Sequence, residues 1–324
     1  MNLDADLDAL GFGIAVGHAT DERGGTGLTV VRGVDAPLRA SAHILGRATG
    51  TRELALLDPG ASNERIDAVL LTGGSAYGLD AAAGVMRWME ERGRGFVIAG
   101  GVVPIVPAAV VFDLAPLGRF DARPSPEMAY RGCHEATSRN ISEGSVGAGT
   151  GCTVGKALGP RRAMKGGVGV GVAGQPGGAG VMAAAVAAVN AFGHVRDFDG
   201  TIIAGPRGED GKPADTERLI ADGQLLRGMG GGGHTTISVV ALNVSLTKVE
   251  LHQVARAASA AYYRRIGPTG TSFDGDVIFA VSPTEGRRAP LIQAEVAATA
   301  ALEHAILRAV RLAKGREGLP GLAD

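Results

Sequence analysis

Short apolar runs that end at glycine turns alternate with stretches of helical spacing over the first two thirds of the chain. Residues 66–71 are apolar except at Asp67 and lead into Thr72-Gly73-Gly74, and residues 79–90 carry apolar side chains at helical spacing. This pattern predicts a strand, a glycine turn and a helix. Further strands are predicted at 96–99, 168–172 and 201–204, and a helix at 125–138 with Pro126 in its first turn. The apolar run 181–189 leaves strand and helix both open.

The last ninety residues have a more regular pattern. It predicts strands at 235–243 and 277–281, and helices at 248–265 and 291–313. Strands and helices alternate too closely for an all-β fold, and neither a shift in composition nor an internal repeat marks a domain boundary. We therefore expect residues 1–324 to form a single α/β unit with helices layered over sheet.

Two long uncharged runs, 95–112 and 166–195, contain glycines and prolines that rule out a continuous apolar helix of about 20 residues. They are predicted to be buried strands with turns, and no membrane association is expected. The N-terminal residues carry Asp4, Asp6 and Asp8 and no basic residue, unlike a secretory signal. Cys133 and Cys152 match no zinc pattern and are predicted to be buried free thiols, so a cytoplasmic location is expected.

Composition narrows the possible functions. The 324 residues include 52 glycines, about 16% (52/324) against a usual ~7%, which indicates many tight turns and close backbone approaches. The net charge of −1 comes from 32 basic and 33 acidic residues scattered along the chain, so no nucleic-acid partner is expected.

Several familiar motifs are only approximated. Residues 169–174 satisfy G-x-G-x-x-G, but the following Gln175-Pro176-Gly177-Gly178 cannot open a helix, and residues 151–156 are too short for a phosphate loop. Ser75 follows a predicted strand as in a nucleophile elbow, but Tyr77 replaces the second glycine. The seven histidines include no pair at ligand spacing, so neither a metal nor a cofactor is expected.

The stretch 228–243 carries the most chemical information. A glycine run ends at His234-Thr235-Thr236 and a predicted strand follows. One interpretation is a flexible loop that enters a strand. The other is self-cleavage, in which a threonine hydroxyl attacks the preceding carbonyl and the resulting ester is hydrolysed to free an N-terminal threonine. That residue would combine a nucleophile with its own α-amine, whose pKa of about 7.7–8.0 suits a base.

Two further positions carry candidate polar groups. Asn190 ends an apolar run, so it needs either a structural partner or a place in a site. Asp274 and Asp276 stand two apart before the predicted strand 277–281. They fit one face of a strand, and equally an acidic turn.

At these residues the chain resembles the DmpA-type aminopeptidases (L-aminopeptidase/D-esterase, including β-aminopeptidases and a pantetheine hydrolase), which are self-cleaving N-terminal-nucleophile hydrolases. The resemblance runs nearly end to end through eight ordered segments: 16–20 (VGHAT), 57–60 (LDPG), 71–80 (LTGGSAYGLD), 104–107 (PIVP), 144–151 (GSVGAGTG), 165–167 (KGG), 189–193 (VNAFG) and 273–276 (FDGD). It implies a four-layer α-β-β-α sandwich and assembly into homo-oligomers, as tetramers or larger.

The resemblance also implies roles for individual residues. Cleavage would fall between His234 and Thr235, giving an α segment of 1–234 and a β segment of 235–324 with Thr235 as nucleophile. Asn190 matches the family's oxyanion-hole asparagine, and Asp276 matches an acidic residue that orients the nucleophile. Asp274 stands where several members have a serine.

Two departures bear on activity and substrate. His234 stands where the family often has Asn or Gly, and Phe112 stands where the β-aminopeptidases have a tyrosine. Ser75, Tyr77 and Phe112 are predicted to line the substrate site. The expected function is an aminopeptidase acting on small peptides, amino-acid amides or esters. The alternatives are acyl transfer or pantetheine-type amide hydrolysis by the same nucleophile, and an uncleaved, non-catalytic binder of a small ligand.

Overall fold

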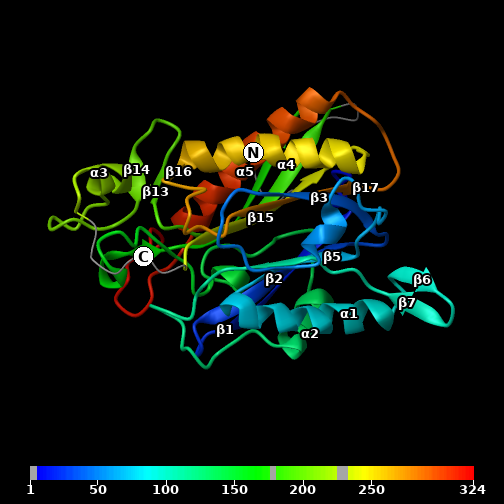
Figure 1. Cartoon of the computed structure of the whole chain (residues 1–324), viewed down its shortest axis with the longest axis horizontal. Helices are drawn as coiled ribbons and strands as arrows, with labels where there is room; N and C mark the ends of the chain where they lie inside the picture. The colour runs from blue at the N-terminus through cyan, green and yellow to red at the C-terminus, as the bar shows by residue number, and fades with distance from the viewer. Residues whose placement is uncertain (1–5, 176–179, 225–232) are drawn as a thin grey trace.

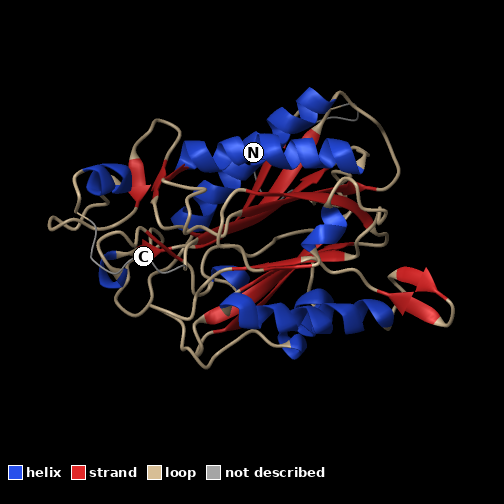
Figure 2. Ribbon diagram, in the orientation of Figure 1, coloured by secondary structure: helices blue, strands red, loops and turns tan. Residues whose placement is uncertain are grey.

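The computed structural model describes residues 6–175, 180–224 and 233–324, and its elements stack in four layers. Helices α4 (Lys248–Arg265) and α5 (Leu291–Arg311) form one outer layer, and α1 (Ala82–Glu90) and α2 (Pro126–His134) form the other (Figure 1). Two sheets lie between them, as the secondary-structure colouring shows (Figure 2). The implied α-β-β-α sandwich is therefore confirmed.

The sheet beside α1 and α2 has the order β1-β2-β5-β8-β4. All its pairs are antiparallel except β5 with β8, which run parallel. Its strands are β1 (Ile14–Asp21), β2 (Thr26–Gly33), β5 (Ala68–Thr72), β8 (Ala108–Val110) and β4 (Thr51–Arg52).

The sheet beside α4 and α5 has the order β11-β12-β15-β17-β3. Its β15 and β17 run parallel and its other pairs are antiparallel. Its strands are β11 (Gly167–Gly174), β12 (Met182–Asn190), β15 (Thr235–Leu242), β17 (Val277–Pro283) and β3 (Leu38–Ile44). The strand that begins at Thr235 is thus central, with neighbours from both sides of the predicted cleavage point.

Three apolar cores hold the layers together. One lies between α4–α5 and their sheet, one between the two sheets, and one between the other sheet and α1–α2. Helix α4 begins with a capping box in which Thr247 and Glu250 satisfy each other's backbone N–H groups. Helix α2 begins at Pro126, which was expected in its first turn, and the Ser125 side chain caps it by accepting the Met128 N–H.

Smaller elements lie around the sandwich. They are the hairpin β6 (Phe96–Ile98) and β7 (Gly101–Val103), the pair β9 (Thr153–Val154) and β10 (Met164–Lys165), the sheet of β13 (His194–Arg196), β14 (Ile202–Ala204) and β16 (Ile266–Gly267), helix α3 (Thr216–Ala221), and the 3-10 helices η1 (Leu54–Leu57), η2 (Ser75–Ala81), η3 (Gly147–Gly149) and η4 (Pro160–Arg162).

Most expected elements are present, with three differences. The run 181–189, left open between helix and strand, is strand β12, which is buried along its whole length. The predicted helix 79–90 begins as the 3-10 helix η2 and becomes α-helical at Ala82. The prediction of a buried strand at 96–99 is wrong on burial, because β6 projects in a hairpin (Figure 1) and Val97 is 77% exposed.

The literal G-x-G-x-x-G segment serves packing. It lies in β11, where Gly169 and Gly171 face α5: a Cβ on either would lie 2.1 Å from a carbonyl oxygen of that helix, at Ala305 or Ala301. Glycine is required because the helix backbone lies directly on the strand. Both cysteines are buried and free, as predicted. In the described parts of the chain, no helix is long and apolar enough to cross a bilayer.

Candidate active site

Thr235 opens the central strand β15 and is 6% exposed. In the strand register it lies opposite Asn190, the last residue of β12. On the other side, the Asp276 carboxylate accepts a hydrogen bond of 2.6 Å from the backbone N–H of Thr236. Three residues that are far apart in the sequence and were predicted to act together therefore meet at one strand end.

The peptide bond between His234 and Thr235 lies against the backbone of Gly275, the residue between the two aspartates. The His234 carbonyl accepts a hydrogen bond of 2.9 Å from the Gly275 N–H. A Cβ on Gly275 would lie 2.8 Å from Thr235 Oγ1, so only glycine lets this backbone approach the hydroxyl so closely. The carbonyl before Thr235 thus has a backbone donor already in place.

The His234 side chain is buried beside Phe192, with ring centroids 4.7 Å apart. Neither ring nitrogen has a hydrogen-bond partner among the described residues. Burial, reinforced by nearby Lys156, lowers the pKa of His234 to about 3, so the ring is neutral. A buried imidazole without partners is costly, which sets His234 apart from an ordinary core residue.

Asn190 is fully buried, and its amide makes contacts in two directions. Its Nδ2 donates to the carbonyls of Phe112 (2.9 Å) and Gly233 (3.2 Å). Its Oδ1 accepts from the Thr153 N–H and from Lys156 Nζ, each at 3.0 Å. One amide N–H therefore points toward the residue two before Thr235 and the other toward the Phe112 carbonyl, and a fixed donor beside Thr235 is what an oxyanion-hole role requires.

Lys156 is a site residue that sequence reasoning missed. Besides Asn190 Oδ1, its ammonium donates to three backbone carbonyls, at Thr153 (2.9 Å), Asn190 (2.8 Å) and Ala191 (3.3 Å). Burial lowers the pKa of Lys156 to about 7. The sequence did contain a signal for it, because Lys156 is the one charged residue of segment 151–156. That segment was compared only with a phosphate-binding loop, which it does not match.

The two carboxylates near Thr235 are both 2% exposed. Asp274 accepts a hydrogen bond from the Thr271 N–H (2.8 Å), and Asp276 also accepts from Thr269 Oγ1 (2.8 Å) and the Gly270 N–H (3.0 Å). Burial raises the pKa of each, and the charge of Asp274 helps raise the pKa of Asp276 to about 7. A carboxylate with such a pKa can exchange protons near neutral pH.

The three predicted substrate-lining residues lie at different distances from this strand end. The Phe112 ring lies against Gly233, since a Cβ on that glycine would lie 3.2 Å from the ring. Ser75 is in the left-handed backbone region (φ 52°) and reaches the site only through its N–H bond to Val111, at 3.0 Å. Tyr77 is 52% exposed and stacks under Arg123. The structure thus brings Phe112 to Gly233 and Asn190, next to Thr235, while substrate-binding roles for Phe112, Ser75 and Tyr77 stay predictions.

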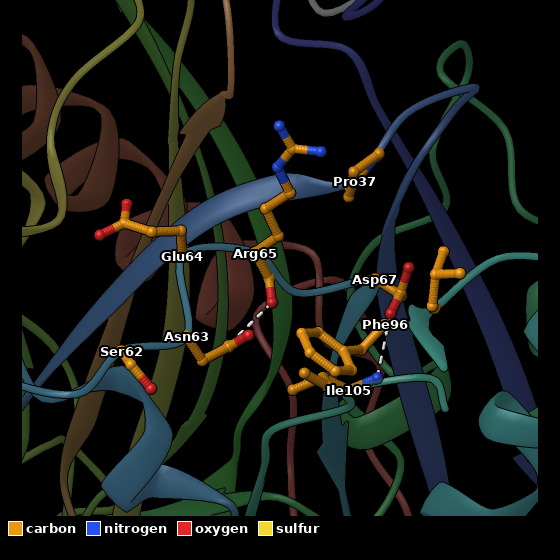
Figure 3. Close-up of a pocket in the computed structure, with 10 residues that line it drawn as sticks. Pro37, Ser62, Asn63, Glu64, Arg65, Asp67, Phe96 and Ile105 are labelled. Carbon is orange, nitrogen blue, oxygen red and sulfur yellow. Dashed lines mark hydrogen bonds between the residues drawn. The ribbon is translucent and has the colours of Figure 1, made fainter. Parts of the chain in front are cut away.

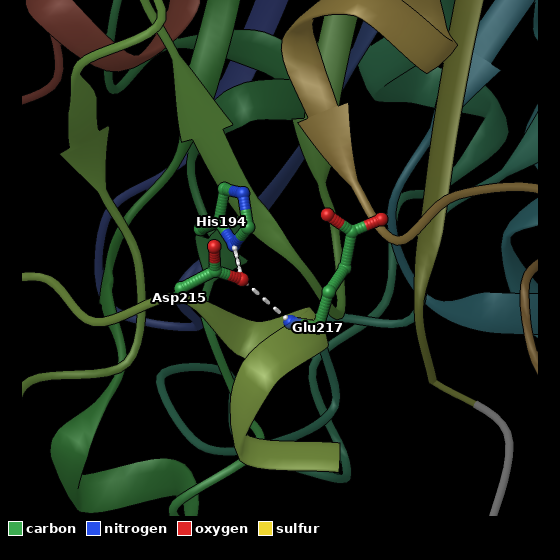
Figure 4. A group of neighbouring side chains, drawn as sticks. All are labelled: His194, Asp215 and Glu217. Carbon is green, nitrogen blue, oxygen red and sulfur yellow. Dashed lines mark hydrogen bonds and ion pairs between the residues drawn. The ribbon is translucent and has the colours of Figure 1, made fainter. Parts of the chain in front are cut away.

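One cluster outside this site resembles a metal centre. His194, Asp215 and Glu217 place one ligand atom each within 4.8 Å of one another (Figure 4). However, His194 Nδ1 already accepts the Thr216 N–H at 2.9 Å, and the Arg196 guanidinium lies 2.6 Å from Glu217. The lone pair and the negative charge that a cation would need are therefore already used.

A surface cavity of about 350 Å³ lies apart from Thr235, between the β6–β7 hairpin and the segment before β5 (Figure 3). The Phe96 ring forms one wall, and the buried Asp67, which accepts the Ile105 N–H at 3.0 Å, lies at its base. None of the predicted site residues lines it. This cavity is therefore not the predicted substrate site.

Comparison with known proteins agrees with the geometry. The model of the family described as peptidase family S58 matches residues 12–322. The chain belongs to peptidase family S58. It is 38% identical over 301 residues to an uncharacterized aminopeptidase of Mycobacterium tuberculosis, covering 86% of this chain and 84% of that protein. It is 31% identical over 286 residues to a 6-aminohexanoate-oligomer endohydrolase of a Kocuria species, covering 84% and 74%.

Among solved structures, this S58 chain is similar to the L-aminopeptidase D-Ala-esterase/amidase of Ochrobactrum anthropi, described as a variant of the Ntn hydrolase fold. The TM-score is 0.68 at 20% identity, covering 93% of this chain and 85% of that one. This likeness confirms the fold. Family membership confirms the resemblance to the DmpA-type enzymes and identifies the chain as a hydrolase of the aminopeptidase and amidohydrolase kind.

Proposed function

We propose that this S58 hydrolase cleaves its own chain between His234 and Thr235, and that the freed Thr235 then hydrolyses amide bonds of small substrates. The observation that carries the proposal is the set of contacts around this bond: the Gly275 N–H bonds to the His234 carbonyl, the Asn190 amide bonds to the Gly233 carbonyl before it, and Asp276 accepts the Thr236 N–H after it. In self-cleavage, Thr235 Oγ1 attacks the His234 carbonyl carbon, and the Gly275 N–H stabilises the negative charge that develops on the oxygen. Collapse of this intermediate breaks the C–N bond between His234 and Thr235, and the proton from the hydroxyl passes to the departing nitrogen, which leaves an ester on Thr235 Oγ1 and a free α-amine on Thr235. Water then hydrolyses the ester, which frees the His234 carboxylate and restores the Thr235 hydroxyl.

In turnover, Thr235 Oγ1 attacks the substrate carbonyl while the α-amine of the same residue takes up the hydroxyl proton. That amine, at a pKa near 7.7–8.0, is partly unprotonated at neutral pH. The Asn190 amide stabilises the tetrahedral oxyanion, and the amine returns the proton to the leaving nitrogen. Water then releases the acyl group from Thr235.

The substrate class follows from the relatives. Similarity to a mycobacterial protein named as an aminopeptidase supports removal of N-terminal residues from small peptides, amides or esters. A second candidate is endohydrolysis of ω-amino-acid oligoamides, supported by similarity to the 6-aminohexanoate-oligomer endohydrolases. Assembly into tetramers or larger and a cytoplasmic location stay predictions. Of the glycine run before His234, residues 230–232 lie outside the described residues, and Gly233 lies within them.

Mass spectrometry of the denatured protein tests the first step. The wild-type protein is expected to give two fragments, 1–234 and 235–324, and Thr235→Ala is expected to give only the intact chain. Thr235→Ser, which keeps a hydroxyl, should still be cut and serves as the matched control. An intact wild-type chain after prolonged incubation would contradict self-cleavage.

Hydrolysis of L-amino-acid p-nitroanilides and of linear 6-aminohexanoate oligomers by the cut protein tests the second step. Release of p-nitroaniline favours the aminopeptidase, and shortening of the oligomers favours the second candidate. If the cut protein hydrolyses neither class, the proposed activity is wrong, even if self-cleavage is correct.

A further inference from the structure

Asp113 is a fully buried carboxylate that directly follows Phe112 in the chain. Its Oδ2 accepts a hydrogen bond of 2.6 Å from Thr26 Oγ1, and its Oδ1 accepts one of 2.7 Å from the Gly74 N–H. Lys165 influences it only through its charge, and burial raises the pKa of Asp113 to about 6. A buried carboxylate without a bonded cation is costly, so its position calls for an explanation.

The backbone is shaped closely around this carboxylate. A Cβ on Gly73 would lie 2.1 Å from Asp113 Oδ2, and one on Gly151 would lie 2.5 Å from Asp113 Cβ. A Cβ on Gly118 would lie 1.9 Å from the Asp113 carbonyl oxygen. Gly73, Gly118 and Gly151 thus lack a side chain where each meets Asp113, and their backbones hold Asp113 from several sides.

The segment held in this way reaches the oxyanion donor. Thr72 O accepts the Val111 N–H (2.8 Å), and Val111 O accepts the Ser75 N–H (3.0 Å), so residues 111–113 are fastened at both ends. Between them, the Phe112 carbonyl accepts one N–H of the Asn190 amide at 2.9 Å. The second N–H of that amide is bonded to Gly233, which belongs to the α segment.

The two N–H groups of the Asn190 amide bond to different segments, Phe112 and Gly233, and this has a functional consequence. As long as the Phe112 carbonyl holds one N–H, the amide plane is fixed, and the other N–H keeps its direction when Gly233 moves away after cleavage. A donor that is fixed in advance stabilises an oxyanion without reorganisation. The Thr153 N–H and Lys156 Nζ hold the Oδ1 end of the amide, so a Phe112 carbonyl that was free to move would release only the Nδ2 end and let the amide plane tilt about the Oδ1 contacts.

We propose that Asp113 is a positioning residue: it fixes the Phe112 carbonyl and thereby orients the Asn190 amide toward the oxyanion formed at Thr235. The inference rests on the proposed function, because it assigns Asp113 a part in the same reaction. It also gives a role to Gly73 and Gly151, which make room for the Asp113 side chain, and to the Gly74 N–H, which bonds to it.

A double-mutant cycle on the cut protein tests this role, with an L-amino-acid p-nitroanilide or a 6-aminohexanoate oligomer as the probe, whichever the wild type hydrolyses. Asp113→Asn keeps the shape but turns one acceptor into a donor, so kcat is expected to fall about tenfold with KM within about twofold. Thr26→Val removes only the hydroxyl donor, and a fall of about threefold is expected. In an Asn190→Ala background, either change is expected to alter kcat by less than twofold.

A merely structural role gives another result. It would lower kcat by the same factor in both backgrounds, and that outcome overturns the proposal, as does an unchanged kcat in a folded Asp113→Asn protein. If Asp113→Asn does not fold, the Thr26→Val cycle decides by the same criterion. Failure of the proposed function is distinguishable, because the cut wild-type protein would then hydrolyse neither probe. An unchanged kcat in Asn190→Ala would show that Asn190 is not the oxyanion donor, and it would overturn the role of Asp113 but not hydrolysis by Thr235.

Discussion

The chain contains two clusters of titratable side chains that differ in how their charges are satisfied. Around Thr235, the charged groups of Lys156, Asp274 and Asp276 are buried and bond to backbone groups, a hydroxyl and a neutral amide. Around His194, the Arg196 guanidinium lies 2.6 Å from Glu217 and 3.5 Å from Asp215, and those side chains are partly exposed.

The pKa values follow this difference. Burial moves the pKa of Lys156 down and that of Asp276 up, so that both reach about 7. In the other cluster, burial alone would raise the pKa of Asp215, but bonds from the Arg218 and Glu217 N–H groups and the nearby His194 and Arg196 charges lower it. Proximity of titratable groups is thus common to both clusters. The candidate active site differs in that, among the described residues, its lysine and both aspartates are buried and none bonds directly to an opposite charge, an environment typical of functional groups.

Removal of the oxyanion donor should have the largest effect. Asn190→Ala is expected to lower kcat on an amide substrate by about 10²–10³-fold, because the developing negative charge loses a fixed donor. Kinetics on the cut protein measure this. Asn243→Ala is the matched control. Asn243 bonds to the backbone of Met182 (2.8 Å) and Gly180 (3.2 Å), at the end of strand β12 opposite to Asn190, so kcat should change less than twofold. Equal losses in both variants would contradict the role of Asn190.

The buried lysine should have the next largest effect. Lys156→Met removes a charged donor to Asn190 Oδ1, and loss of such a bond, worth about 1.5–3 kcal/mol, should lower kcat by about 10–100-fold. Lys165→Met is the control, since that lysine is equally buried but donates only to the Gly149 and Gly166 carbonyls. Both variants are expected to lose thermal stability. If their kcat values fall equally, Lys156 has no specific part in the site.

Much of this architecture could be predicted from the sequence, because the signals were local. Thr235 stands at the start of an apolar run after a series of glycines, and Asn190 stands at the end of another apolar run. Both candidate site residues could therefore be recognised at the ends of predicted strands. Helix α4 was predicted at its observed bounds from the regular pattern of the last ninety residues, and the structure adds that Thr247 and Glu250 begin it with a capping box.

Other features depend on contacts between distant segments. Strands β1, β2 and β3 were not predicted, and the burial of β6 was predicted wrongly, because local pattern does not show whether another layer covers a strand. Lys156 and Asp113 gain their roles only from partners at Asn190 and Gly74, which the fold brings to them.

Asp276 and His194, one group from each cluster, should also give the free energy of unfolding opposite pH dependences. The folded pKa of Asp276, about 7, lies above its unfolded value near ~3.9, so the folded state holds the extra proton and stability falls as pH rises through this window. Burial and the Arg196 charge lower the folded pKa of His194 to about 4. Below its unfolded value near ~6.5 the folded state therefore holds fewer protons, and stability rises with pH.

Urea unfolding at pH 5 and pH 7, in an uncut Thr235→Ala background, measures these contributions. Asp276→Asn removes the falling contribution, so the change in stability from pH 5 to pH 7 should become more positive by about 1–2 kcal/mol. His194→Gln removes the rising contribution and should make the same change more negative by about 1–2 kcal/mol. Shifts of the same sign in the two variants would show that Asp276 and His194 do not differ in this way.

The smallest effect is expected from a change in the cluster of His194, Asp215 and Glu217. Glu217→Gln breaks its pair with Arg196, and because that pair is partly exposed, stability should fall by less than about 1 kcal/mol and kcat by less than twofold. Addition of Zn²⁺ or of a chelator to the wild-type protein should change neither kcat nor the melting temperature, since Thr216 and Arg196 already occupy the groups a cation would need. Saturable stabilisation by Zn²⁺ that disappears in His194→Gln would instead show that this cluster binds metal, and that a nearby guanidinium does not prevent a cation from binding there.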